Sequence, residues 1–222
     1  MENNKKLFWE NFYLQKDPYG HDKYYSEKRR RRDSIALLSH RNLHFVKCLE
    51  LGCGIGKITE ILIDFSDKIT AVEISENAIQ KAKNSLNTYI NKILFIPKDM
   101  YEIEFNEGDF DSIVGLESLD YTNEKYDQIS KWIKWLKPGG VILFSGPNLE
   151  GYFKYDELIR LFNRPELEIL EMKIVTTKFP LQWFISRIPL LQNNFFWNVN
   201  MFFANSFPKT FAKHIAILVR KK

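Results

Sequence analysis

The run LELGCGIGKITEIL, residues 49–62, could hold a nucleotide. Its three glycines are Gly52, Gly54 and Gly56. A glycine-rich turn between a strand and a helix brings backbone amides close to a ligand, but the dinucleotide fingerprint also needs a glycine where this chain has Lys57. Glu50, just ahead of the turn, would repel a pyrophosphate and would attract an ammonium or a sulfonium. The turn therefore predicts a nucleoside-like ligand with a cationic tail.

Two more acidic residues follow the next two apolar runs. Glu73 comes about 20 residues after Gly52, the separation expected of a carboxylate that accepts both ribose hydroxyls. Asp99 could accept the exocyclic amine of an adenine while Met100 covers the ring. Ile74 and Leu116, at the ends of expected strands, complete the expected ligand contacts. Together these positions predict a slot for an adenosine that bears a charged amino-acid tail.

Alternating patterns of strand and helix would position these residues. We expect strands at 46–51, 68–74, 92–98, 110–116 and 141–146, and helices at 26–40, 57–65, 75–90 and 124–136, the last stopped by Pro138-Gly139-Gly140. After residue 150 we expect a helix at 155–162, a strand at 167–175, an aromatic segment and a last strand at 214–222. Such alternation predicts a mostly parallel sheet covered on both faces, with ligands at the carboxyl ends of its strands.

Length and composition narrow the class of protein. The chain has 222 residues, of which 45% are hydrophobic and 15% aromatic, enough to bury the core of one domain. Cys48 and Cys53 fall in a buried strand and the glycine turn, so we expect both to be reduced. The start of the sequence lacks a secretory pattern and no long apolar stretch occurs, which predicts a cytoplasmic protein. The net charge of +4 owes much to KRRRR at 28–32, more typical of a solvated helix face than of a DNA-binding surface.

Five segments in order resemble the motifs of the class I S-adenosylmethionine-dependent methyltransferases. They read ELGCGIGKIT, AVEIS, PKDM, FDSIVGLESLDY and LKPGGVILFSGPN, and the likeness covers about residues 45–147. The resemblance implies S-adenosylmethionine as cofactor and a Rossmann-like, seven-stranded, mostly parallel α/β sheet with helices on both faces. It also implies one domain over 1–222. This domain would comprise an N-terminal helical cap at 1–44, a cofactor-binding core at 45–150, and at 151–222 the last strands with an aromatic acceptor or lid segment.

A narrower likeness lies at residues 17–38, DPYGHDKYYSEKRRRRDSIALL, which is similar to the nodulation-protein-S-like methyltransferases that act on the amine of a glucosamine unit. In that family an aromatic residue, a Glu and an Arg recur beside the cofactor, and here they fall on Tyr25, Glu27 and Arg29. Ser26 departs from the pattern, since relatives tend to have a second aromatic there. The resemblance implies cofactor contacts for Tyr25 and Arg29, with Arg29 near the cofactor carboxylate. The alternative is that Arg29 belongs to the solvated basic run.

Methyl transfer depends mainly on positioning, with a base for an acceptor that must lose a proton. The loop GLESLDY offers Glu117, Asp120 and Tyr121 as catalytic candidates, and His21 is a fourth. Tyr121 stands where many small-molecule methyltransferases have a His, which moves the prediction for a base to the acids or to His21. Glu117 could instead only hold the loop or contact the cofactor. For the other histidines, His214 among them, we expect structural or solvent-facing roles, and we predict no metal site.

Missing motifs restrict the acceptor. No Asn/Asp-Pro-Pro-Tyr run and no cysteine follow the fourth strand, which argues against nucleobase methylation. We expect an amino or hydroxyl group of a sugar, glycan precursor or similar small molecule. The alternatives are a lipid-linked acceptor, RNA, or a cofactor-binding protein without activity. The aromatic segment 179–211 could be a lid, a patch for peripheral membrane contact or a dimer surface. Its side chains that could stack on an acceptor or meet a phosphate are Trp183, Phe184, Phe195, Phe196, Trp197 and Arg187.

Overall fold

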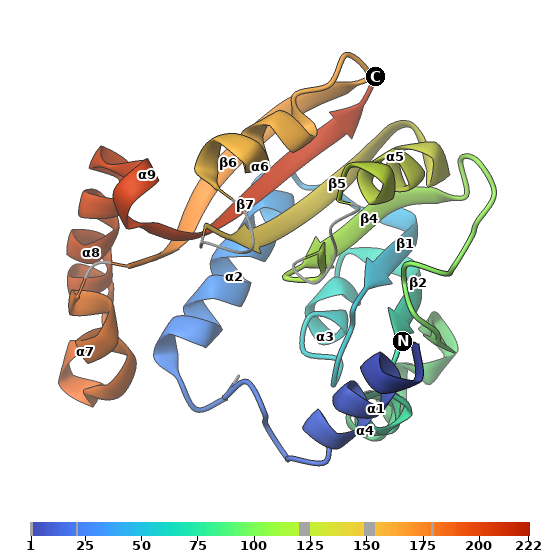
Figure 1. Ribbon diagram of the computed structural model, residues 1–222, viewed down its shortest axis with the longest axis horizontal. Coiled ribbons are helices and arrows are strands. Elements are labelled where there is room, and N and C mark those ends of the chain that lie inside the picture. The colour runs from blue at the N-terminus through green and yellow to red at the C-terminus, as the bar shows by residue number, and fades with distance from the viewer. Residues whose placement is uncertain (1, 21, 120–124, 149–153, 179) are drawn as a thin grey trace.

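A computed structural model describes residues 2–20, 22–119, 125–148, 154–178 and 180–222, which surround one mixed sheet (Figure 1). The strands are β1 (Phe45–Leu51), β2 (Ser66–Glu73), β3 (Ile93–Pro97), β4 (Phe110–Leu116), β5 (Leu136–Pro147), β6 (Leu167–Thr177) and β7 (Ala212–Lys221). Their order is β3-β2-β1-β4-β5-β7-β6, and among these strands β7 alone runs in the opposite direction, antiparallel to both β5 and β6. The prediction of a seven-stranded, mostly parallel sheet is confirmed.

Helices cover both faces of the sheet. They are α1 (Glu2–Phe12), α2 (Tyr25–Ser39), α3 (Thr59–Leu62), α4 (Glu76–Ser85), α5 (Lys125–Trp135), α6 (Tyr155–Phe162), α7 (Leu181–Arg187), α8 (Asn194–Ser206) and α9 (Pro208–Phe211), with 3-10 turns at η1 (Asn87–Lys92) and η3 (Pro189–Leu191). Adjacent β4 residues show the division: Ile113 joins the apolar cluster of α5 and α6, and Val114 joins that of α2, α3 and α4. Side chains alternate across a strand, so these clusters lie on opposite faces.

Some element boundaries differ from those expected. The helix expected at 57–65 is the single turn α3, and the helix expected at 75–90 ends at Ser85 before η1. Pro138-Gly139-Gly140 does not cap α5 but lies inside β5, where the pairing with β4 shifts register. A Cβ on Gly140 would lie 2.9 Å from the Asp111 carbonyl oxygen, so the glycine allows β5 to pass close to β4. The helix ends at Trp135, one residue before the predicted end, but the three residues predicted to stop it belong to the next strand.

The aromatic segment forms α7, η3, α8 and α9, which project together at the left of Figure 1. Asn193 caps α8, because its side-chain oxygen accepts a hydrogen bond from the Phe196 amide at 3.2 Å. No helix within the described ranges combines the length and apolar character needed to cross a membrane.

The antiparallel direction of β7 matters for the site. The first five strands end at one edge of the sheet, and β7 begins there, with His214 paired to Pro147 at the end of β5. A residue at the start of β7 therefore lies beside the loops that follow the parallel strands.

Candidate functional site

The turn between β1 and α3 lies at the centre of the carboxyl edge. Gly52, Gly54 and Gly56 have φ values of +75°, +51° and +82°, a region that favours glycine. A Cβ on Gly54 would lie 2.8 Å from the Tyr13 hydroxyl, and one on Gly52 would lie 3.2 Å from the Ser118 Cβ. A Cβ on Gly56 would instead meet Ala82 and Leu86 of the neighbouring helical segment at 3.0 Å. Gly52 and Gly54 line cavity 2, whereas Gly56 permits packing.

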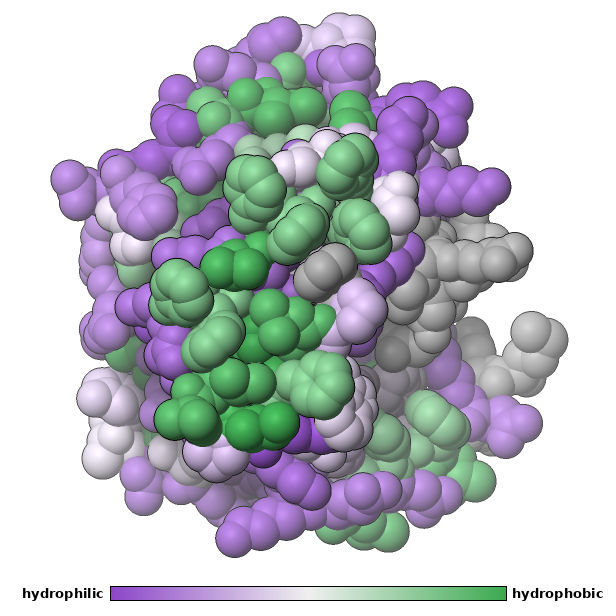
Figure 2. Space-filling view, turned by 90° about the vertical axis from the view of Figure 1, so that its left-hand side faces the viewer, coloured by the Kyte–Doolittle hydropathy of each residue, from purple (hydrophilic) through white to green (hydrophobic). Residues whose placement is uncertain are grey.

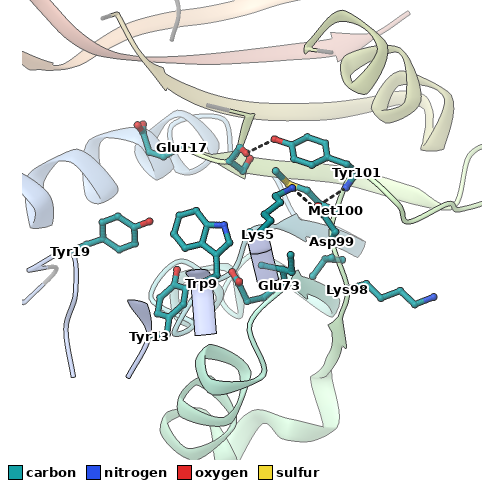
Figure 3. A pocket seen from close by; sticks show the side chains of 14 residues that line it. Lys5, Trp9, Tyr13, Tyr19, Glu73, Lys98, Asp99, Met100, Tyr101 and Glu117 are labelled. Atoms are coloured by element: carbon teal, nitrogen blue, oxygen red, sulfur yellow. Dashed lines mark hydrogen bonds and ion pairs between the residues drawn. The ribbon is translucent and has the colours of Figure 1, made fainter. Parts of the chain in front are cut away.

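Glu73, at the end of β2, is held by backbone amides. Its carboxylate accepts hydrogen bonds from the amides of Gly54 and Ser75, each at 3.0 Å. Burial raises the pKa of Glu73, and these amides oppose that shift. The carboxylate lies in cavity 1, the space beside β2 and β3 shown in Figure 3.

Cavity 1 has the shape of a slot between two walls. Figure 3 shows Trp9, Tyr13 and Tyr19 on one side and Asp99 with Met100 on the other, while Lys98 points away. Ile74 and Gly52 also line the slot. An aromatic wall opposite a carboxylate and a thioether suits a flat ring with an exocyclic amine.

Helix α1 roofs this slot. Its Lys5 forms an ion pair with Asp99 at 2.5 Å, and Glu10 accepts hydrogen bonds from the amides of Glu76 and Asn77 at 2.8 and 3.0 Å. Glu10 thus satisfies free amides at the first turn of α4. The sequence placed this helix in the N-terminal cap but did not predict the aromatic wall to which its Trp9 and the adjacent Tyr13 contribute.

Glu50 lies beneath the glycine turn and is not among the lining residues of the cavities. It is 3% exposed and accepts a hydrogen bond from the Thr59 hydroxyl at 2.7 Å. Burial raises its pKa to about 7. Glu50 therefore supports the glycine turn from below. It does not line the space in which the sequence led us to expect the ligand.

Cavity 2 continues from cavity 1, with a volume of about 350 Å³. The two share Tyr13, Tyr19, Gly52 and Glu117 in their linings. Gly54 and Leu116 line cavity 2, as do Arg30 and Arg31 of α2. The glycine turn thus faces cations on the opposite side of this space, an arrangement suited to an amino-acid tail.

Glu117 lies at the junction of cavities 1 and 2. Its φ of +59° is rare for a non-glycine residue, and such strain is often stored at functional sites. The carboxylate accepts a hydrogen bond from the Ser145 hydroxyl at 2.7 Å and contacts Arg30 at 3.1 Å and His214 at 3.4 Å. Burial opposes ionisation, yet the pKa of Glu117 lies below its ordinary value because these partners stabilise the carboxylate.

His214 is the partner that the sequence reading missed. Its Nδ1 lies 2.5 Å from the Thr176 hydroxyl, and its Nε2 faces Glu117. Burial lowers the pKa of His214 to about 4, so the imidazole is neutral at pH 7 and Arg30 is the cation that keeps Glu117 ionised. The sequence did contain one indication of this role. Residues near the start of an antiparallel last strand lie at the edge of the sheet where the parallel strands end.

Two predicted cofactor residues of α2 face elsewhere. Arg29 donates a hydrogen bond to the Asn194 side chain at 2.8 Å and lies over the Trp197 ring, which Tyr25 also contacts. The ligand-facing side of α2 instead carries Glu27 and Arg30, which form an ion pair at 2.8 Å. Arg30 and not Arg29 lines cavity 2, because one residue along a helix turns the side chain by roughly 100°.

Three predicted catalytic residues, His21, Asp120 and Tyr121, lie outside the described residues. Within the described ranges, no group of three or more His, Cys, Asp and Glu side chains is placed to hold a metal ion.

Cavity 3 adjoins cavity 2 and has a volume of about 540 Å³. It shares Tyr19, Glu27, Lys213 and His214 with cavity 2. Its other walls include Trp183 and Arg187 of α7, with the Arg187 guanidinium 4.7 Å from the Trp183 ring centre. The three cavities thus follow one another along the edge, with Glu117 at the first junction and His214 at the second.

Comparisons with known proteins agree with this geometry. Residues 49–144 match a family model described as a methyltransferase domain. Over 102 residues, or 45% of this chain, the sequence is 33% identical to a malonyl-[acyl-carrier protein] O-methyltransferase of Priestia megaterium, of which the match covers 36%. It is 30% identical over 102 residues to nodulation protein S of Azorhizobium caulinodans, covering 45% of this chain and 48% of that one. The match spans less than half the length of these two relatives.

The fold extends the likeness to the whole chain. The crystal structure of the N-methyltransferase NodS from Bradyrhizobium japonicum in complex with S-adenosylhomocysteine aligns with a TM-score of 0.74 and 19% identity, covering 98% of both chains. At this identity the likeness concerns the fold.

Proposed function

We propose that the protein, whose residues 49–144 match a methyltransferase domain, transfers a methyl group from S-adenosylmethionine to an amino or hydroxyl group of a sugar, glycan precursor or similar small molecule. The observation that carries the proposal is the series of three cavities. An amide-held carboxylate, Glu73, lies at its nucleoside end, and the pair of Glu117 and His214 lies midway.

The residues of cavities 1 and 2 fit the cofactor. Glu73 would accept the ribose hydroxyls, and Asp99 with Met100 would hold the adenine after Lys5 yields its place on Asp99. Gly52 and Gly54 leave room that any side chain would fill. When bound, the cofactor supplies a methyl group on a sulfonium, a good leaving group.

The cofactor's carboxylate needs cations. Arg30 and Arg31 line cavity 2 beside the glycine turn, and we assign the carboxylate to this pair in place of Arg29. Glu50, at the base of the turn, keeps only an indirect role through Thr59.

Glu117 is the proposed proton acceptor. It is ionised and borders both cavity 1 and cavity 2. His214, Arg30 and Ser145 surround this carboxylate and serve to orient it. A hydroxyl acceptor at this junction would give its proton to Glu117 as the new C–O bond forms and the C–S bond of the sulfonium breaks, whereas an ammonium would give up its proton before its nitrogen attacks the methyl carbon. Roles for His21, Asp120 and Tyr121 stay predictions.

The acceptor is proposed to enter through cavity 3, which leads to His214 and carries aromatic and polar side chains. Trp183, Tyr24 and Tyr19 could stack on sugar faces, and Thr177 and Gln182 add hydrogen-bonding groups. The chain's resemblance to the nodulation-protein-S family supports an amino sugar as the first acceptor to test.

Release of S-adenosylhomocysteine across a panel of amino sugars, nucleotide sugars, lipid-linked sugars and tRNA tests the proposal. We expect turnover with a sugar amine or hydroxyl that Glu117→Gln abolishes. Turnover only with tRNA, or cofactor binding without turnover on any panel member, would contradict the proposed acceptor class. The cytoplasmic location expected from the sequence is a further prediction.

A lipid-linked acceptor is the second candidate, because cavity 3 shares α7 with an exposed apolar surface. The same panel separates it from a free sugar.

A further inference from the structure

Helix α8 carries apolar side chains on two opposite sides. Its inner side buries Trp197, Asn200 and Ala204, each no more than 1% exposed. Its outer side presents Phe195 and Phe202, which are 69% and 66% exposed. Two large exposed phenylalanines on a helix whose other side is buried indicate that the outer side of α8 lacks a cover.

This surface extends over the neighbouring segments. Trp183 and Phe184 of α7, Leu190 of η3 and Phe207 before α9 are also exposed, Leu190 at 83%. Figure 2, which views the side of the molecule formed by α7–α9, shows these apolar groups gathered on one face. We call the exposed side chains of 183–207 on this face the apolar patch. Large contiguous patches on soluble domains mark binding surfaces.

The segment that carries the apolar patch is basic, although Asp156 of α6 pairs with its Lys209 at 2.7 Å. Residues 172–222 contain no Asp or Glu. The cations of this stretch are Lys173, Lys178, Arg187, Lys209, Lys213, Arg220, Lys221 and Lys222. Lys178 and Arg187 are exposed next to the patch, and neither forms an ion pair with a carboxylate of the described residues. An apolar face bordered by cations is complementary to an anionic lipid surface.

A second copy of the chain fits this face less well. A two-fold contact places a patch against itself. Lys178 and Arg187 of both copies would then come together, and residues 172–222 offer no acid to pair with them. Charge complementarity therefore favours lipid over a dimer.

We propose that α7, η3 and α8 dock the protein onto an anionic lipid bilayer, with Phe195, Phe202 and Leu190 entering the boundary between headgroups and acyl chains. Trp183 and Arg187 lie at the level of the headgroups, since both also line the entrance of cavity 3. A docked molecule thus opens cavity 3 toward the membrane surface. The inference does not depend on the methyl-transfer proposal, because docking requires no cofactor.

Vesicle sedimentation tests this docking with the full chain. We expect the protein to sediment with vesicles of equal parts phosphatidylcholine and phosphatidylglycerol, to bind vesicles of phosphatidylcholine alone more weakly, and to lose part of its binding in high salt. Lys178→Gln should weaken binding to the anionic vesicles about fivefold.

The decisive variant is Phe195→Ser/Phe202→Ser, which should weaken binding at least about tenfold because two large apolar groups no longer enter the bilayer. Its matched control is Tyr89→Ser/Leu94→Ser, which removes two exposed apolar side chains, 46% and 61% exposed, far from the patch. The control should bind like the wild type. Calorimetry with S-adenosylmethionine reports whether both variants keep the structure of the wild type around cavity 1.

Three results would overturn the proposal. They are no sedimentation of the wild type with anionic vesicles, equal binding by the patch variant and its control, and a wild-type dimer in sedimentation velocity that Phe195→Ser/Phe202→Ser converts to a monomer. The last result would assign the apolar patch to a second copy.

Discussion

At the ends of β1 and β2, the proposed cofactor residues are held mainly by backbone groups, whereas at the ends of β4 and β7 the proposed acceptor residues are held by side chains. Glu73 accepts two amide hydrogen bonds from residues within twenty positions of it in the chain. Glu117 is held by Ser145, Arg30 and His214, which come from β5, α2 and β7. Backbone-held sites tolerate sequence change around them, while side-chain-held sites depend on each partner. The predictions below test this difference, from the largest expected effect to the smallest.

The largest effect should follow Glu117→Gln, which keeps the shape of the side chain but removes the proton acceptor. We expect kcat to fall at least about a hundredfold, the usual contribution of a general base. Steady-state kinetics with the acceptor identified by the panel would measure it, and cofactor affinity, taken from calorimetry, should stay near the wild-type value. An unchanged kcat would show that Glu117 only holds its loop.

His214→Gln should change how stability depends on pH. The pKa of His214 is lowered to about 4, below its unfolded value, so the unfolded state binds more protons between pH 6.5 and 4 and the wild type loses stability as the pH falls. The loss specific to His214 amounts to at most about 3 kcal/mol. Urea unfolding at pH 7 and pH 4.5 should show a smaller loss in the variant, and equal losses in the two proteins would contradict the buried, neutral imidazole.

Glu73→Ala should weaken S-adenosylmethionine binding by about 1 to 3 kcal/mol, the value of a lost buried hydrogen-bond pair. Calorimetry measures this directly. Glu76→Ala, which removes an exposed acid three residues along the chain, is the control and should bind like the wild type. Equal affinities of Glu73→Ala and the wild type for S-adenosylmethionine would contradict the proposal that Glu73 accepts the ribose hydroxyls.

The smallest expected difference is between alanine variants of two neighbouring residues of α2, Arg29 and Arg30. Arg30→Ala should weaken cofactor binding by about 1 kcal/mol and reduce activity, because Arg30 faces cavity 2 and Glu117. Arg29→Ala should reduce thermal stability through its lost contacts with Asn194 and Trp197, with cofactor affinity unchanged. The reverse pattern would restore the assignment first made from the sequence.

The residues that the sequence singled out in the backbone-held half lie around one continuous space. Gly52, Gly54, Glu73, Asp99 and Met100 line cavities 1 and 2, because a strand end and a tight turn fix where these residues lie. The prediction placed Glu50 at the ligand. The alternation of side chains along a strand does not show whether a polar residue next to a turn faces the ligand or lies beneath the turn. The hydroxyl of Thr59, nine residues later, donates a hydrogen bond to the Glu50 carboxylate.

The side-chain-held half was much less predictable. His214 approaches Glu117 only because β7 inserts between β5 and β6 in reverse direction, a contact across almost a hundred residues. Arg30 was missed because the phase of α2 about its axis depends on packing against α8, not on the spacing of its charges. The helices of residues 181–211 followed no amphipathic pattern, since α8 is apolar on both sides.

Titration calorimetry of the wild-type chain with S-adenosylmethionine, NAD and NADP tests the central claim most directly. The glycine turn without a third dinucleotide glycine predicts binding of S-adenosylmethionine with no detectable binding of NAD, and Glu73, which suits an unphosphorylated ribose, predicts no binding of NADP. Binding of NAD without S-adenosylmethionine would contradict the account.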